Sequence, residues 1–312
     1  MQPKIVVIGS ANLDMLVRAS RIPRPGETVL GGGLLQSRGG KGANQAVAAA
    51  RLGAQITFVA RLGRDATGQE ACAAYEKEGI NIQYIAWDES APSGVALIVI
   101  DPAGENTIVV APGANASLST DDIARAEEQI KTADCLLLQL EIPLESVIAA
   151  ARLAHARGVR VILDPAPAVP LPDELYALTD LLTPNESECA VLVGFPVSDP
   201  ASAERAAAIL LQRGVKQVII KLGERGAYFH DGTAGEWITG FQVEALDTTA
   251  AGDAFNAALA VALSQGGTLR EAIRFANAAG ALSATRRGAQ PSLPKLEEVK
   301  NFLGKGNLIE SD

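Results

Sequence analysis

The strongest constraint on the fold is a regular alternation of short apolar runs with longer helical stretches. Apolar runs at 136–140, 159–163 and 218–221 are separated by helical stretches that include 144–157 and 201–213, and further apolar runs stand at 4–9 and 56–60. Strands that are apolar throughout are typical of a parallel sheet with helices on both faces. The sequence therefore predicts an α/β fold with a mostly parallel central sheet.

Two segments depart from this alternation. In the first, about 12–37, strand-like pieces flank Pro23, Pro25 and Gly26; in the second, about 91–112, runs at 94–100 and 106–110 flank an Asp-Pro-Ala-Gly turn at 101–104. Proline, glycine and aspartate at such places favour turns between strands. We expect the two insertions to lie together as a β-sheet lid on a single α/β domain that spans 1–312. A further strand is predicted at 82–85.

An excess of acidic residues bears on the partners of the chain. The 312 residues include 27 Lys and Arg against 36 Asp and Glu, which gives a net charge of −9. Such a surface repels nucleic acid and anionic lipid, so we expect neither as a partner. No apolar run reaches transmembrane length, and the first residues have the pattern of a strand rather than of a signal peptide. We therefore expect a cytoplasmic protein.

Polar residues and glycines recur directly after the predicted strands. In parallel sheets, ligands bind at the carboxyl ends of the strands, where loops and helix starts meet. The residues at these places are Asn12, Asp14, Gly40, Lys41, Asn44, Glu141, Asn185, Glu188, the turn 222–226 with Gly223 and Gly226, and the segment 247–253. Their recurrence at one end of the sheet predicts a ligand site there.

The segment 247–253, Asp-Thr-Thr-Ala-Ala-Gly-Asp, opens a predicted helix at 251–264. Small residues and a glycine at a helix start let backbone N–H groups approach an anion closely. A carboxylate at Asp253 would repel that anion, but it would serve to accept a proton from a hydroxyl that attacks a phosphoryl group. The alternative, that Asp253 only caps the helix, remains open at this point.

Several strings resemble the signatures of one enzyme family in the expected order. Gly-Gly-Lys-Gly-Ala-Asn at 39–44 and the segment 247–253 are similar to the paired signatures of the ribokinase branch of the carbohydrate kinase family, also called the PfkB family. Leu-Gln-Leu-Glu at 138–141, Thr-Pro-Asn-Glu at 183–186 and Arg-Arg-Gly-Ala-Gln-Pro-Ser at 286–292 resemble it too. The resemblance implies a ribokinase-like three-layer sandwich with a small β-sheet lid. It also implies ATP-dependent phosphorylation of D-ribose at O5.

The resemblance implies roles for the residues at the sugar and at the transferring phosphoryl. The sugar would be bound by Asn12, Asp14, Gly40, Lys41, Asn44, Glu141 and Asp253. Amides and carboxylates suit vicinal hydroxyls, which both donate and accept hydrogen bonds. Asp253 would be the base, and the turn of Ala250, Ala251 and Gly252 would hold the phosphoryl.

The resemblance also implies a nucleotide site and two cations. ATP would contact Asn185, Lys221, Gly223, Gly226, Gly252 and Asn277. Glu188 would act on Mg²⁺, through water if the ion keeps its hydration shell. A monovalent cation, K⁺, would be bound by Asp247, Thr249, Ser283, Arg286, Gly288 and Ser292, largely through backbone carbonyls. Many ribokinases have Thr where this chain has Lys221, which leaves the role of that side chain open.

Other assignments stay open. Within the family, a kinase of deoxyribose, fructose or adenosine is an alternative, and a sugar-binding regulator without catalysis is another. The resemblance also implies that two copies pair through their lids, so we expect a homodimer with Val29, Leu34 and Val99 exposed for that contact. The chain has neither a P-loop nor a Gly-x-Gly-x-x-Gly after its first strand, and contains only two histidines. These features argue against P-loop enzymes, dinucleotide oxidoreductases and histidine-based hydrolases.

Overall fold

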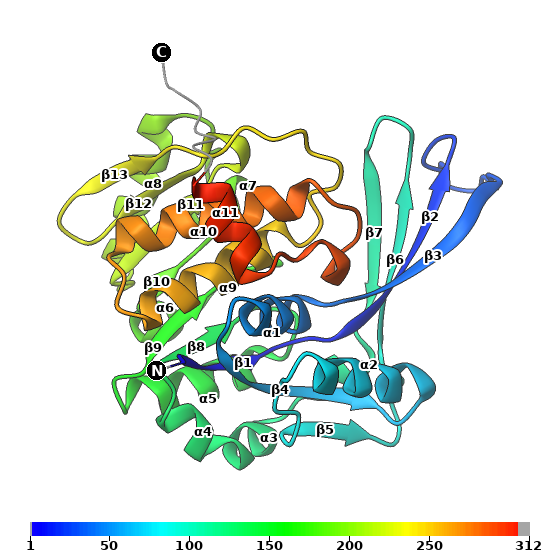
Figure 1. The fold of residues 1–312 in the computed structure, drawn as a ribbon, viewed down its shortest axis with the longest axis horizontal. Helices are drawn as coiled ribbons and strands as arrows, with labels where there is room; N and C mark the ends of the chain where they lie inside the picture. Colours follow the sequence, from blue (N-terminus) through cyan, green and yellow to red (C-terminus); the bar gives the residue numbers. More distant parts are fainter. Residues whose placement is uncertain (1, 305–312) are drawn as a thin grey trace.

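Strands that the sequence predicts as parallel form one large sheet. The structure, a computed structural model, describes residues 2–304. Nine strands lie in the order β13-β12-β11-β10-β9-β8-β1-β4-β5 (Figure 1). Their bounds are β1 (Lys4–Ile8), β4 (Gln55–Gly63), β5 (Ile85–Asp88), β8 (Cys135–Leu138), β9 (Arg160–Leu163), β10 (Leu181–Leu182), β11 (Gln217–Lys221), β12 (Ala227–His230) and β13 (Gly235–Ile238). The strands from β5 to β11 are parallel, and β12 and β13 continue the sheet as an antiparallel hairpin.

Helices cover both faces of this sheet because its strands are apolar on both faces. In β1, Ile5 and Val7 belong to one hydrophobic core, and Val6 and Ile8 belong to the other. The first core packs against α1 (Lys41–Arg51), α2 (Ala66–Lys77), α9 (Ala251–Ser264), α10 (Leu269–Ala284) and α11 (Leu296–Gly304). The second packs against α3 (Thr120–Arg125), α4 (Glu127–Lys131), α5 (Leu144–His155), α6 (Asp173–Leu178), α7 (Glu186–Val193) and α8 (Pro200–Gln212). The expected three-layer α/β fold is confirmed.

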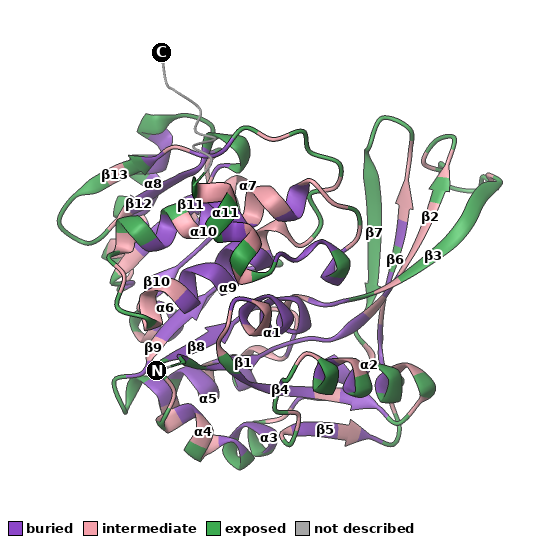
Figure 2. Ribbon diagram, in the orientation of Figure 1, coloured by how far each residue is buried: buried purple, intermediate pink, exposed green. Residues whose placement is uncertain are grey.

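The two insertions form a separate four-stranded sheet, which we call the lid. Its order is β3-β2-β6-β7, with β2 (Asn12–Ala19), β3 (Gly31–Gly39), β6 (Gly94–Ile100) and β7 (Asn106–Ala111). The sheet stands beside the main body, and much of its surface is exposed (Figure 2). Of the three apolar residues expected to be exposed, Leu34 is 54% exposed, whereas Val29 and Val99 are partly buried. The expected lid is confirmed, and the expectation for the two valines is wrong.

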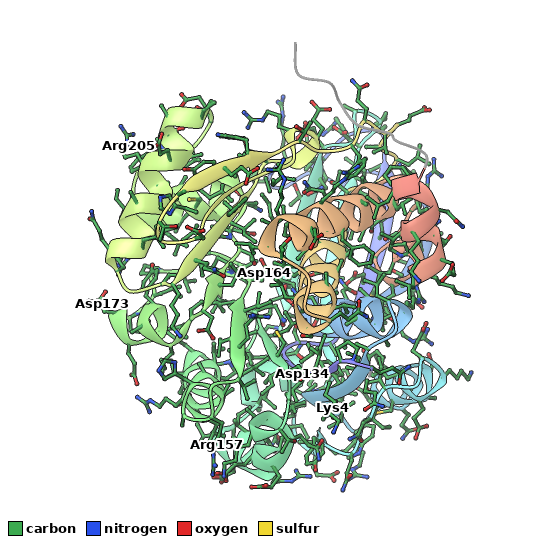
Figure 3. All side chains as sticks on the ribbon, turned by 60° about the vertical axis from the view of Figure 1, so that its left-hand side comes forward. Lys4, Asp134, Arg157, Asp164, Asp173 and Arg205 are labelled. Carbon is green, nitrogen blue, oxygen red and sulfur yellow. The ribbon has the colours of Figure 1, made fainter. Side chains whose placement is uncertain are left out.

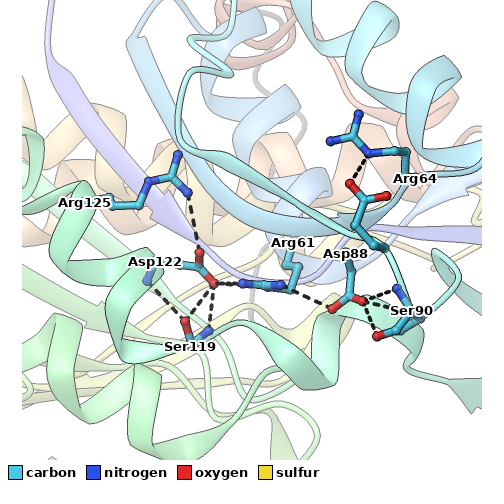
Figure 4. Close-up of polar contacts among 9 residues, drawn as sticks. Arg61, Arg64, Asp88, Ser90, Ser119, Asp122 and Arg125 are labelled. Carbon is cyan, nitrogen blue, oxygen red and sulfur yellow. Dashed lines mark hydrogen bonds and ion pairs between the residues drawn. The ribbon is translucent and has the colours of Figure 1, made fainter.

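The second insertion is anchored at its root by a charged network. Arg61 on β4 donates to Asp122 at 2.8 Å and to Asp88 at 3.3 Å (Figure 4). The other oxygen of Asp88 accepts the backbone amides of Ser90 and Ala91, which lead into β6. These hydrogen bonds hold the pKa of Asp88 well below its usual range. The chain therefore enters the lid from a fixed point at the end of β5.

One predicted strand is misplaced. The segment 82–85 was expected to be extended, but the strand is β5, which begins at Ile85. Asn81 makes a single bridge to Thr57, and its side chain accepts the amide of Gln83, which starts a turn. The turn delays the pairing with β4 until Ala60 meets Ile85. Within residues 2–304 the structure has no helix long and apolar enough to cross a membrane.

Candidate active site

The predicted site residues surround two adjoining cavities at the carboxyl ends of the parallel strands. The first, the lid cavity, has a volume of about 640 Å³ and lies between the lid and the main sheet. Its lining includes Asn12, Asp14, Gly40, Lys41, Asn44, Glu141, Asp164, Asn185, Glu188, Lys221, Gly223, Thr249, Ala250, Gly252 and Asp253. The second, the α10 cavity, has a volume of about 360 Å³. Lys221, Gly223 and Gly252 line both cavities, so these residues mark the junction between them.

Asp253 lies in the first turn of α9 and faces the lid cavity, with only 5% of its surface exposed. Its two oxygens accept hydrogen bonds from Asn44 at 2.9 Å and from Gln45 at 3.1 Å. The residue that caps α9 is Ala250, and no side chain makes a capping bond there. The alternative in which Asp253 is a helix cap is therefore wrong.

The turn before α9 holds an unusual backbone conformation. Ala250 has φ 62°, and among the described residues it is the one non-glycine residue with positive φ. This left-handed conformation is costly for a residue with a Cβ, and such strain clusters at functional sites. The amide of Ala251 donates to the carbonyl of Thr248 at 3.2 Å, and Gly252 at the start of α9 lies at the junction, where a helix N-terminus would stabilise an anion.

Polar residues on the lid and on α1 form the wall opposite Asp253. Asn12 and Asp14 are buried on β2, at the root of the lid. Gly40 has φ 87°, and a Cβ there would lie 2.7 Å from the amide nitrogen of Asn12, so only glycine fits this close approach. Glu141 accepts the amide of Lys41 at 3.0 Å, which ties the end of β8 to the start of α1.

Burial and like charge shift the proton affinities of these groups. Burial raises the pKa of Asp253 to about 6, against the opposing charge of Lys41. Burial, with Glu141 and Asp253 adding to it, raises the pKa of Asp14 to about 7. Burial by itself would lower the pKa of Lys41, but the surrounding carboxylates hold it above the ordinary lysine value. The site thus contains carboxyl groups poised near neutral pH, as a general base requires.

The α10 cavity is formed mainly by α9, α10 and the loop after β13. Phe241, Val243, Phe255 and Ala281 give it an apolar lining, and Asn277 is buried at its wall. The turn after β11 is closely packed against this loop, since a Cβ on Gly226 would lie 2.1 Å from the carbonyl oxygen of Ile238. Gly223, Gly226, Gly252, Lys221 and Asn277 all line this cavity.

Asn185 and Glu188 line the lid cavity, but their geometry differs from the predicted one. Both were expected on one face of a helix, whereas Asn185 is the residue that caps α7. Its side chain accepts the amide of Glu188, and Glu188 accepts the backbone and side-chain N–H groups of Asn185 at 2.8 and 2.9 Å. Burial raises the pKa of Glu188, opposed by the charge of Lys221.

The residues expected around K⁺ lie on two segments, one at 247–249 before α9 and one from the end of α10 to residue 292. Asp247 accepts the amides of Thr249 and Gly288, both at 2.9 Å. Burial would raise the pKa of Asp247, but these hydrogen bonds hold it below its ordinary value. On the second segment the hydroxyls of Ser283, near the end of α10, and Ser292 lie 2.7 Å apart. The side chain of Arg286 instead pairs with Glu298 at 2.6 Å, so only the backbone of Arg286 is free to contribute to a cation site.

Four polar residues at the site escaped the sequence analysis. They are Gln45, Asn115, Gln139 and Asp164. Asp164 follows β9 directly, so the rule that picked out Glu141 after β8 would have found it. Gln45 lies inside a helix and Gln139 at a strand end, and the sequence alone does not show whether a glutamine at such a place is buried or exposed. Asn115 lies just beyond the lid, and only the tertiary fold brings it to Asn12.

Comparisons with known proteins agree with one another. A family model described as pfkB family carbohydrate kinase matches residues 2–296. The ribokinase of Haemophilus influenzae is 44% identical over 303 residues, which cover 97% of this chain and 99% of that protein. The deoxyribokinase of Salmonella typhi is 36% identical over 300 residues, which cover 96% and 98%. The structure of Arabidopsis thaliana ribokinase complexed with ribose and ATP matches with a TM-score of 0.89 at 37% identity, covering 97% of this chain and 99% of that one.

Proposed function

The chain belongs to the pfkB family of carbohydrate kinases, and on that premise we propose that it transfers the γ-phosphoryl group of ATP to O5 of D-ribose, giving D-ribose 5-phosphate and ADP. One observation carries the proposal: a buried carboxylate, Asp253, and the first turn of α9 stand where two cavities of different character meet. The lid cavity is lined by amides and carboxylates, which suit a sugar. The α10 cavity has an apolar lining with glycine turns, which suits a nucleotide.

In this reaction Asp253 accepts the proton of the attacking hydroxyl. Asn44 and Gln45 hold its carboxylate in place, and a pKa of about 6 leaves it ionised at neutral pH. The turn from Ala250 to Gly252 holds the phosphoryl group, whose oxygens carry charge in the transition state, chiefly through the amide of Gly252, since that of Ala251 donates to Thr248. Asn12, Asp14, Lys41 and Glu141 bind the sugar hydroxyls and orient O5. Closure by the lid keeps water from competing as the acceptor.

The residues present fit ATP with Mg²⁺. The apolar lining of the α10 cavity would hold the base, with Asn277 at its wall, and Lys221 would reach the phosphates. Mg²⁺, when bound, neutralises phosphate charge during transfer. Glu188 and Asn185 stand in the lid cavity near the junction, and both oxygens of Glu188 already accept hydrogen bonds from Asn185. A contact through water, which Mg²⁺ favours, fits that arrangement.

We also propose that K⁺ binds the two segments beside the turn before α9, 247–249 and the end of α10 to residue 292. Asp247 holds the backbone of Thr249 and of Gly288 close to it, and the hydroxyls of Ser283 and Ser292 lie together. Backbone carbonyls of these segments, that of Arg286 included, would supply the oxygen atoms. A cation held by these oxygens would stabilise the strained backbone of the turn without touching the sugar. Its contribution is therefore to the conformation of the phosphoryl site.

The proposed activity is tested with a sugar panel, run with and without K⁺. Coupled ADP release would be measured for ribose, 2-deoxyribose, fructose and adenosine. We expect the highest kcat/KM for ribose and a higher rate with K⁺ than without it. Deoxyribose is the critical comparison, because the deoxyribokinase of Salmonella typhi is 36% identical to this chain. An equal kcat/KM for 2-deoxyribose and ribose would contradict ribose as the substrate. Ribose binding without ADP release would indicate a sugar-binding regulator instead.

Asn12→Ala is expected to raise KM for ribose about tenfold and to leave KM for ATP unchanged. The side chain is buried at the lid root, and Asn115 donates to its oxygen at 2.8 Å, so its NH₂ group is directed elsewhere. A tenfold rise in KM corresponds to a loss of about 1.4 kcal/mol in binding free energy, the size expected for one lost hydrogen bond to a sugar hydroxyl. Asn81→Ala is the control, because Asn81 bridges Thr57 near the start of β4 and does not line the lid cavity. Equal rises in both KM values would contradict a role confined to the sugar.

We propose that two copies pair through their lids. Leu97 and Val109 form an exposed cross-strand pair on one face of the lid, and Leu35 and Ile108 are exposed on the other. Exposed apolar side chains in such numbers are typical of an interaction surface. Sedimentation should find a dimer, and glutamate at both exposed residues of one face, either Leu97 and Val109 or Leu35 and Ile108, should produce a monomer. A wild-type monomer at micromolar concentration, or dimers in both double variants, would contradict the pairing.

A further inference from the structure

Asp164 is a buried carboxylate at the centre of the site to which the proposed mechanism gives no role. It follows β9 directly, lies near the middle of the molecule (Figure 3) and is 2% exposed. A carboxylate removed from water is costly unless charged or polar partners compensate for it. The partners of Asp164 are therefore informative about what this group does.

The two oxygens of Asp164 point to two different parts of the site. One accepts a hydrogen bond from the ammonium of Lys221 at 2.8 Å. The other accepts from the side-chain amide of Gln45 at 3.1 Å, and the same nitrogen of Gln45 donates to Asp253 at 3.1 Å. Gln139 donates in turn to the oxygen of Gln45 at 2.7 Å, which fixes which way that amide faces. Asp164 thus connects a lysine at the nucleotide side to the proposed base.

Lys221 stands at the junction of the two cavities. It lines both of them, and its ammonium nitrogen lies 3.5 Å from where a Cβ on Gly252 would be. Its side chain is 12% exposed, and a lysine ammonium has three donors, of which Asp164 takes one. The remaining donors are at the point through which a phosphoryl group would pass from one cavity to the other.

We propose that Asp164 is a positioning residue for phosphoryl transfer, which holds Lys221 against the transferring group and Gln45 against Asp253. This inference rests on the proposed kinase function. Without its partner, the flexible lysine chain would have several rotamers at the junction. With it, the positive charge is fixed beside the first turn of α9, where charge develops in the transition state. The negative charge of Asp164 also adds to the raised pKa of Asp253.

The test compares Asp164→Asn, Lys221→Thr and the double variant in steady-state kinetics with ribose and ATP. We expect Asp164→Asn to lower kcat at least tenfold and to raise KM for ATP severalfold, with KM for ribose within twofold of wild type. Lys221→Thr should lose as much or more, and the loss in the double variant should be smaller than the product of the two single losses. Asp180→Asn, which breaks an exposed Lys216–Asp180 pair of 2.6 Å elsewhere on the sheet, is the matched control.

The double variant separates a chemical role from a structural one. The double variant removes both charges, so no buried lysine charge remains unpaired. Thermal unfolding reports whether this variant is folded. A folded double variant that remains at least tenfold below wild type in kcat supports the proposal, even if Asp164→Asn does not fold. A double variant with wild-type kcat, or an Asp164→Asn variant with wild-type kcat and KM for ATP, would overturn it. If the wild type phosphorylates no sugar, the proposed function fails instead.

Discussion

Asp253→Asn is expected to lower kcat for ribose by roughly 10²–10⁴-fold while ATP still binds. The amide keeps the shape of the carboxylate but cannot accept the proton of the attacking hydroxyl. Asn44 and Gln45 now donate to the two carboxylate oxygens, and one of these hydrogen bonds can persist to the amide oxygen. The residue also lies away from the apolar lining of the α10 cavity, so nucleotide affinity should change little.

Two measurements check this result. ADP release at saturating substrates gives kcat, and calorimetric titration with ATP gives the affinity. The control is Asp134→Asn, since Asp134 only accepts the amide of Lys4 at the amino end of the sheet (Figure 3). Turnover within threefold of wild type in Asp253→Asn would remove this residue from the chemistry, whatever its effect on stability.

Lys41→Met is expected to move the acidic limb of kcat/KM upward by about one pH unit or more. In the proposed mechanism activity requires the Asp253 carboxylate, whose pKa is raised to about 6, so we expect wild-type activity to be lost as the pH falls through that value. The charges that face Asp253 are Lys41 on α1, Asp164 after β9 and Asp14 on β2. Among the charged groups around Asp253, Lys41 lowers its pKa most, so the removal of Lys41 raises that pKa toward neutral pH.

The pH profile distinguishes this effect from a simple loss of sugar binding. Removing a hydrogen bond to ribose would lower kcat/KM by the same factor at every pH. Raising the pKa of the base lowers kcat/KM most below pH 7, by about tenfold for each pH unit through which that pKa rises. Lys131→Met, on the surface of α4, is the control for a lysine outside the site. An acidic limb that stays in place or moves downward would contradict the assigned electrostatics.

The sequence predicts the layers and the lid well because both depend on local patterns. The alternation of apolar runs and helices places the parallel strands, and turn residues such as Gly26 mark the lid insertions. The segment 82–85 is misplaced because the backbone amide of Gln83 donates to the side chain of Asn81 and a turn forms there, before β5 begins. Apolar content cannot reveal such a local bond. The hairpin of β12 and β13 is absent from the predicted elements, although Asp231-Gly232 between two runs with aromatic residues is a typical hairpin turn.

For the site too, features that depend on local patterns can be predicted, and features that depend on particular tertiary contacts cannot. Residues that follow strands, such as Glu141 and Asn12, can be predicted because topology alone brings strand ends together. The interpretation of Asp253 depends on the three-dimensional structure. The same residues would stand at 247–253 whether Asp253 capped the helix or acted as a base, and only the groups that donate to its carboxylate distinguish the two. The role of Lys221 was open for a similar reason. Its partner Asp164 lies 57 residues away in the sequence, and only the sheet places them 2.8 Å apart.

The position of Asn12 and Asp14 on β2 has a thermodynamic consequence. Both side chains rise from a strand that is hydrogen-bonded on either side, to β3 and to β6. Asn115 further fixes Asn12 with bonds to its backbone neighbour Ala11 at 2.9 and 3.2 Å. A sugar that meets such a wall does not have to order a loop, so little conformational entropy is lost on binding. The affinity of the lid cavity should therefore depend on the match between hydroxyls and fixed partners, which favours discrimination between closely related pentoses.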